Sequence, residues 1–162
     1  MADGSGQGYG VILLTFLGAY LLAVVPMPQW LLWARPEWVA LTLVYWVIAL
    51  PHRVGIASAL LLGVGLDLLE GALLGQNAFA LVVVATLSQV LYQRLRLYSL
   101  WQQSSVIFVL VGINQLICQW VQNLQGVGAQ SLLFLLPAVS SALLWPVILL
   151  VLRSLRRTYR VT

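Results

Sequence analysis

Residues 54–76 form the stretch that most constrains how this chain can fold. The run VGIASALLLGVGLDLLEGALLGQ is long and apolar enough to cross a bilayer as a helix, at about 1.5 Å per residue. Small residues that recur at fourfold spacing are interpreted as a helix-packing face: Ala59, Gly63, Gly71 and Gly75. Because carboxylates rarely face lipid, Asp67 and Glu70 should turn inward or toward a partner. Residues 54–75 are therefore predicted to be the central packing helix of a membrane bundle.

The composition excludes a soluble domain. The chain is 62% hydrophobic and 7% charged, which is too little charge to cover a water-exposed surface. We expect an all-α integral membrane protein, a single membrane domain over residues 1–162 with a basic cytoplasmic tail at 153–162. The six predicted transmembrane helices are residues 9–25, 36–50, 54–75, 78–92, 104–122 and 131–152.

The arginines predict the orientation in the membrane. All eight basic residues are Arg, and they lie at the ends of apolar runs, where topology signals belong, so the net charge of +4 does not indicate nucleic-acid binding. With six spans, placing both termini in the cytoplasm leaves only Arg35 on the outer side. The basic tail is expected to contact anionic membrane lipids or a cytoplasmic partner. Its arginines are Arg153, Arg156, Arg157 and Arg160.

This orientation predicts a charged cluster near the outer face. Arg35 is the basic side chain that can approach Asp67 or Glu70, and Glu37 lies beside it in the sequence. The alternative is that Arg35 and Glu37 lie in interfacial water. Two acids there could also bind a cation or relay a proton, but we favour a structural role or a partner contact, since no repeated half or mid-membrane polar cluster is visible.

The predicted helix at 104–122 carries a polar stripe of Gln115, Gln119 and Gln122, whose amides should seek partners across helices. Enzyme chemistry has little support, because motifs for a nucleophile, a metal or a phosphate-binding loop are absent. His52 is the only histidine and Cys118 the only cysteine. We therefore expect no catalytic residues, no metal and no cofactor.

Several short motifs resemble the MreD family of bacterial rod-shape-determining membrane proteins. They begin with Arg35-Pro36-Glu37-Trp38-Val39 and continue through 43–46, 49–54, 63–67 and 71–75. Weaker matches follow at 100–103 and at 144–146, before the basic tail. The stretch from Arg35 to Gly75 is the specific part. The resemblance implies that the Arg35-Pro36 pair and Asp67 are important positions.

The resemblance also implies a function and partners. It implies a non-enzymatic inner-membrane scaffold of the elongasome that binds the bitopic protein MreC and supports rod shape and lateral peptidoglycan synthesis. Through MreC it would join MreB, RodZ, RodA and a class B penicillin-binding protein. The fold is expected to be similar to substrate-binding subunits of energy-coupling-factor transporters. That similarity leaves a second hypothesis open, a small-molecule or lipid-binding membrane subunit.

Overall fold

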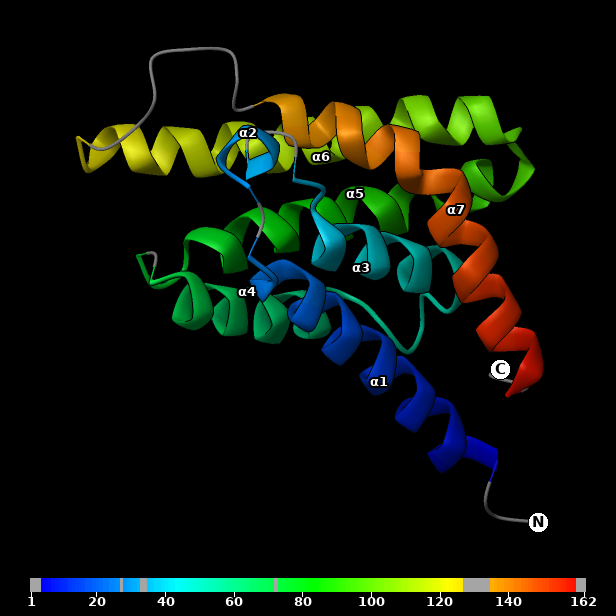
Figure 1. The fold of residues 1–162 in the computed structure, drawn as a ribbon. Coiled ribbons are helices and arrows are strands. Elements are labelled where there is room, and N and C mark those ends of the chain that lie inside the picture. Colours follow the sequence, from blue (N-terminus) through cyan, green and yellow to red (C-terminus); the bar gives the residue numbers. More distant parts are fainter. Residues whose placement is uncertain (1–3, 27, 33–34, 72, 127–134, 160–162) are drawn as a thin grey trace.

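A computed structural model describes residues 4–26, 28–32, 35–71, 73–126 and 135–159. These residues form six longer helices and one short one, and no strand. Figure 1 shows the start of the first helix and the end of the last helix on the same side of the bundle. The helices are α1 (Gly4–Val24), α2 (Gln29–Leu32), α3 (Trp38–Ala49), α4 (Ile56–Glu70), α5 (Gln76–Leu97), α6 (Leu100–Leu124) and α7 (Leu136–Thr158).

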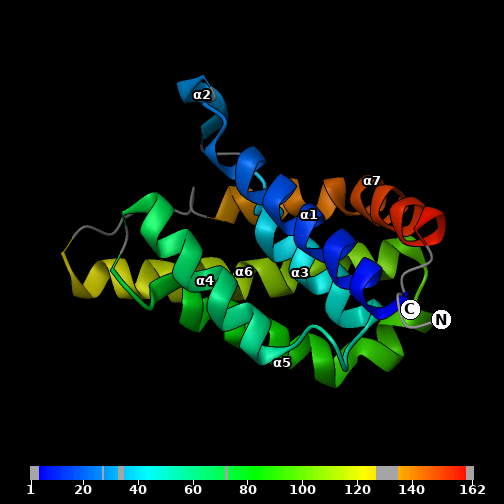
Figure 2. The ribbon, with the colours of Figure 1, turned by 90° about the horizontal axis from the view of Figure 1, so that it is seen from below.

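Helix α3 occupies the centre of the bundle. It packs against α1, α5, α6 and α7, and ten of its twelve residues are buried. Figures 1 and 2 both show it enclosed by the other helices. The prediction that residues 54–75 form the central helix is therefore wrong. Helix α3 is apolar on all sides, a composition that allows burial on all sides.

Helix α4 instead forms a peripheral hairpin with α5, its main neighbour. The predicted close approach of backbones occurs in this hairpin. Ala59 and Gly63 are buried, and a Cβ built on Gly63 would lie 2.1 Å from the Cα of Ala78 in α5. Leu60, Leu61 and Leu68 cover the opposite, exposed face of α4. The small residues thus bring α4 and α5 together, as expected of a helix-packing face.

Gly71 and Gly75 have a different role from the one predicted. Helix α4 ends at Glu70, and both glycines lie in the connection to α5 with positive φ angles of 67° and 102°. No atom of a neighbouring residue lies within 4 Å of a Cβ built at either position. They are therefore turn glycines rather than packing glycines, because left-handed backbone is unfavourable for residues with a Cβ.

The helix bounds differ from the predicted ones at several ends. Helix α5 extends to Leu97, and α6 begins at Leu100. Helix α7 continues to Thr158, so the arginines at 153, 156 and 157 belong to its last turns and not to a tail. Arg160 and residues 131–134 of the sixth predicted helix lie outside the described residues. The segment 29–32 forms the short α2, which Figure 2 shows projecting from the bundle.

Three helices are long and apolar enough to cross a membrane: α5, α6 and α7. The apolar parts of α1 (Gly8–Val24) and α3 are shorter. We call the end of the bundle where α4 stops and α5 starts the acidic end, because it carries Glu37, Asp67 and Glu70. The opposite end, at Arg53, Arg96 and Arg157, is called the arginine end.

Candidate functional site

Three of the described charged side chains, Asp67, Arg35 and Arg96, form hydrogen bonds with main-chain groups at helix ends. Both oxygens of the Asp67 carboxylate accept hydrogen bonds from main-chain N–H groups at the start of α5, Gly75 and Asn77, each at 2.8 Å. Asp67 is only 1% exposed. A carboxylate at a helix N-terminus satisfies unpaired donors and complements the helix dipole. Asp67 is thus turned inward, and it is not available to a partner protein.

Arg35 and Arg96 do the same at helix C-termini. The Arg35 guanidinium donates to the carbonyls of Leu22 (3.1 Å) and Val25 (3.0 Å) at the end of α1. The Arg96 guanidinium donates to the carbonyls of Ile48 (2.9 Å) and Ala49 (3.0 Å) at the end of α3. Cations at these positions satisfy carbonyls that lack an intrahelical partner. This role of Arg96 was not predicted, because Arg96 lies in the last turn of α5 and binds the end of a different helix, α3.

The residues of the predicted cluster lie near one another at the acidic end. Hydrogen bonds from amide side chains, and not an ion pair among the described residues, hold its glutamates. Asn77 Nδ2 donates to Glu70 at 3.0 Å, and Cys118 Sγ lies 3.6 Å from Asn77 Oδ1. Gln115 Nε2 donates to Glu37. The predicted pairing of Arg35 with Asp67 or Glu70 is not formed among the described residues. Arg35 and Asp67 are each bonded to main-chain groups, and Glu70 accepts from Asn77. The hydrogen bonds instead connect α3 with α6, and α4 with α5.

Glu37 joins α3 to α7 as well as to α6. Its main-chain N–H donates to Ser141 Oγ at 3.0 Å. Pro36 precedes it in the connection from α2, outside the helices.

For the other two residues of the polar stripe, the described hydrogen bonds include one, and it stays within α6. Gln119 is buried, and its Nε2 lies 3.5 Å from Asn123 Oδ1, while Gln122 is half-buried one turn away. Another bond between helices was not foreseen: Trp145 Nε1 of α7 donates to Gln103 Oε1 of α6 at 3.1 Å. Among the described residues, no group of three or more His, Cys, Asp or Glu could hold a metal ion.

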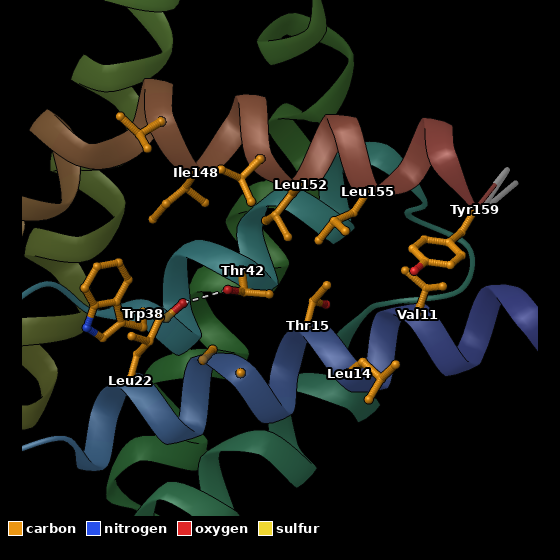
Figure 3. A pocket seen from close by; sticks show the side chains of 14 residues that line it. Val11, Leu14, Thr15, Leu22, Trp38, Thr42, Ile148, Leu152, Leu155 and Tyr159 are labelled. Carbon is orange, nitrogen blue, oxygen red and sulfur yellow. Dashed lines mark hydrogen bonds between the residues drawn. The ribbon is translucent and has the colours of Figure 1, made fainter.

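An apolar groove lies between α1 and α7, with α3 as its floor (Figure 3). Its volume is about 530 Å³. Figure 3 shows Ile148, Leu152 and Leu155 of α7 facing α1 across this space. The groove residues are Val11, Leu14, Thr15, Gly18, Ala19, Leu22, Trp38, Thr42, Val147, Ile148, Val151, Leu152, Leu155 and Tyr159. We call it the α1–α7 groove.

Local features of the sequence open this groove. Pro146 lies inside α7 and cannot donate a helical hydrogen bond, and Figure 1 shows α7 changing direction along its length. The residues of α7 that line the groove all follow this proline. Trp46 Nε1 of α3 donates to Thr15 Oγ1 at 2.8 Å and holds α1 to the floor. Thus α1 and α7 both contact α3 but scarcely touch each other.

Two side chains with polar nitrogen atoms, Arg35 and Trp38, lie near the acidic end of the groove. The Leu22 carbonyl that Arg35 binds belongs to a groove residue, and Trp38 also lines the groove. Arg35 Nε and Trp38 Nε1 are buried there without a hydrogen-bond partner among the described residues. Buried donors that lack an acceptor are uncommon in folded proteins.

The fold and the site define a helical membrane protein with an open lateral groove and charges that cap helix ends. A family model described as "rod shape-determining protein MreD" matches residues 6–155. The rod shape-determining protein MreD of Haemophilus influenzae is 35% identical over 146 residues, which cover 90% of each chain. The chain therefore belongs to the MreD family. No solved structure matched the chain, so no comparison supports the predicted similarity to energy-coupling-factor subunits.

Proposed function

We propose that this protein is a non-enzymatic scaffold of the bacterial inner membrane whose α1–α7 groove binds the transmembrane helix of a bitopic partner of the MreC type. The observation that carries the proposal is the groove itself, which is apolar, open on one side and continuous along two helices. Membership of the family supports a role in rod-shape determination. Through the bitopic partner, the scaffold would act with MreB, RodZ, RodA and a class B penicillin-binding protein in lateral peptidoglycan synthesis.

The dimensions of the groove suit a helix. The lining runs from Val11 to Leu22 on α1, about 16 Å, and from Val147 to Tyr159 on α7, about 18 Å. This length matches about eleven residues of a partner helix, which is over half of a membrane span. A volume of about 530 Å³ admits one face of a helix, as in other helix-in-groove complexes.

The floor of the groove suits close helix packing. Gly18 and Ala19 lie next to Thr15 on the groove side of α1, and small residues allow helices to approach closely in a membrane. A Cβ built on Gly18 meets no neighbouring atom within 4 Å. A partner helix that offers small residues or a hydroxyl could therefore pack directly on the α1 backbone.

The arginines support an orientation with both termini in the cytoplasm. Arg53, Arg94, Arg96 and the arginines of α7 belong to one end, and an excess of positive charge is typical of the cytoplasmic side. The acidic end then faces outward, where the soluble domain of a bitopic partner would begin. A partner helix in the groove would be held at a fixed height relative to that domain.

A substitution of Gly18 tests the groove directly. Gly18→Leu should fill the groove without a clash inside the bundle, because the space beside Gly18 is open. The matched control is Gly10→Leu, which lies on α1 outside the groove and is also unobstructed. Each variant would be co-expressed with the bitopic partner, extracted in mild detergent and analysed by native mass spectrometry.

The expected result is loss of the complex in Gly18→Leu and its retention in Gly10→Leu, with the same helical content in both. Retention of the partner by a folded Gly18→Leu protein would overturn the assignment of the groove. A stoichiometric small molecule in place of the partner would favour the hypothesis of a ligand-binding subunit.

A further inference from the structure

A second groove lies between α1 and α4, on the other side of α1. It has a volume of about 340 Å³ and is lined mainly by aliphatic and aromatic side chains. Leu13, Leu17 and Leu61 line it and are more than half exposed. Toward the acidic end, the Tyr20 hydroxyl donates to the carbonyl of Leu62 and joins α1 to α4. We call this space the α1–α4 groove.

Arg53 lies at the arginine end of the same groove. Its guanidinium carbon is 5.2 Å from the centre of the Tyr9 ring, which also lines the groove. Nη1 of Arg53 is buried and has no hydrogen-bond partner among the described residues. The cation–π contact compensates only part of the loss of hydration of the charge.

No described carboxylate can neutralise Arg53. Glu37, Asp67 and Glu70 belong to the acidic end, and their oxygens accept hydrogen bonds there. Asp67 lies eleven residues into α4, about 16 Å along its axis from the end near Arg53. A partly buried cation that lacks a counter-ion favours an external anion.

We propose that the α1–α4 groove binds an anionic phospholipid, with the phosphate on the Arg53 guanidinium and one acyl chain along the groove. The phosphate would accept hydrogen bonds from the accessible side of the half-buried guanidinium and would balance the charge, while Nη1 itself stays buried. The acyl chain would cover Leu13, Leu17 and Leu61. A phospholipid explains both features, because a soluble anion would leave the apolar groove unfilled. This proposal does not depend on the α1–α7 groove or its partner.

The test compares two lipids and two arginines. The full chain, purified in mild detergent, would be titrated with phosphatidylglycerol or with phosphatidylcholine of the same acyl chains, and bound lipid would be counted by native mass spectrometry. We expect preferential binding of phosphatidylglycerol, weakened about tenfold or more in Arg53→Gln, because a hydrogen bond to a charged group is lost. Arg94→Gln is the matched control, since Arg94 is an exposed arginine at the same end that does not line the groove.

A second variant keeps the test decisive if Arg53→Gln does not fold. Ser58 lines the groove, and Ser58→Phe should block the acyl chain while it leaves Arg53 unchanged. Weakened phosphatidylglycerol binding in Ser58→Phe supports the proposal. Equal binding of the two lipids, or undiminished phosphatidylglycerol binding in either folded variant, overturns it. In that case Asp3, which lies outside the described residues, is the remaining acid of the chain that could pair with Arg53.

Discussion

Gly63→Ala should disrupt the contact between α4 and α5. The added Cβ would lie 2.1 Å from the Cα of Ala78, 2.4 Å from its N and 2.8 Å from the carbonyl carbon of Asn77. All three are backbone atoms, so no side chain can rotate away. Restoring an ordinary contact of 3.4 Å requires the helices to separate by about 1.3 Å, the difference between 3.4 and 2.1 Å.

The separation should also weaken the cap of α5. The two hydrogen bonds from Asp67 are 2.8 Å long, and a shift of this size along them would take both beyond hydrogen-bonding distance. Overpacking costs about 1–3 kcal/mol, and loss of a cap costs about 0.5–2 kcal/mol. We therefore expect a loss of about 3 kcal/mol, which corresponds to a fall in Tm of roughly 6–12 °C for a chain of this size.

The assay is thermal unfolding of the purified protein in detergent, followed by circular dichroism. Gly112→Ala is the matched control, because Gly112 is also a buried helical glycine, but a Cβ built there meets nothing within 4 Å. Gly112→Ala should unfold at or above the Tm of the parent protein. Equal Tm values for Gly63→Ala and Gly112→Ala would refute the close approach of α4 and α5.

A further prediction concerns the acidic end. Asp67→Asn should lower the stability of the protein by about 1–2 kcal/mol, because a neutral amide accepts weaker hydrogen bonds from the start of α5. Hydrogen exchange at Gly75 and Asn77 should accelerate in this variant, and unchanged exchange there would contradict the capping role.

The sequence predicts the helices and the close-packing face better than it predicts their arrangement. The fourfold spacing of Ala59 and Gly63 correctly indicates a backbone contact, because only small residues permit it. The same spacing misleads at Gly71 and Gly75, since a glycine that packs and a glycine in a left-handed turn look alike in a sequence. The turn is what places the first N–H groups of α5 beside Asp67.

The central position of α3 was less predictable for a physical reason. In water, a helix that is apolar on all sides must be buried in protein. In a bilayer the lipid is also apolar, so the same composition fits a central helix or a peripheral one. The grooves were not predictable either, because they depend on the divergence of α7 from α1 and of α4 from α1.

Site-specific photo-crosslinking in growing cells tests the central claim most directly. A photoreactive residue would replace Val151, which lines the α1–α7 groove and is 53% exposed, or Leu143, which lies on the same helix outside the groove and is 74% exposed. The groove hypothesis predicts a crosslink to the transmembrane helix of the bitopic partner from position 151 and none from position 143. A crosslink from position 143 with none from position 151 would contradict it.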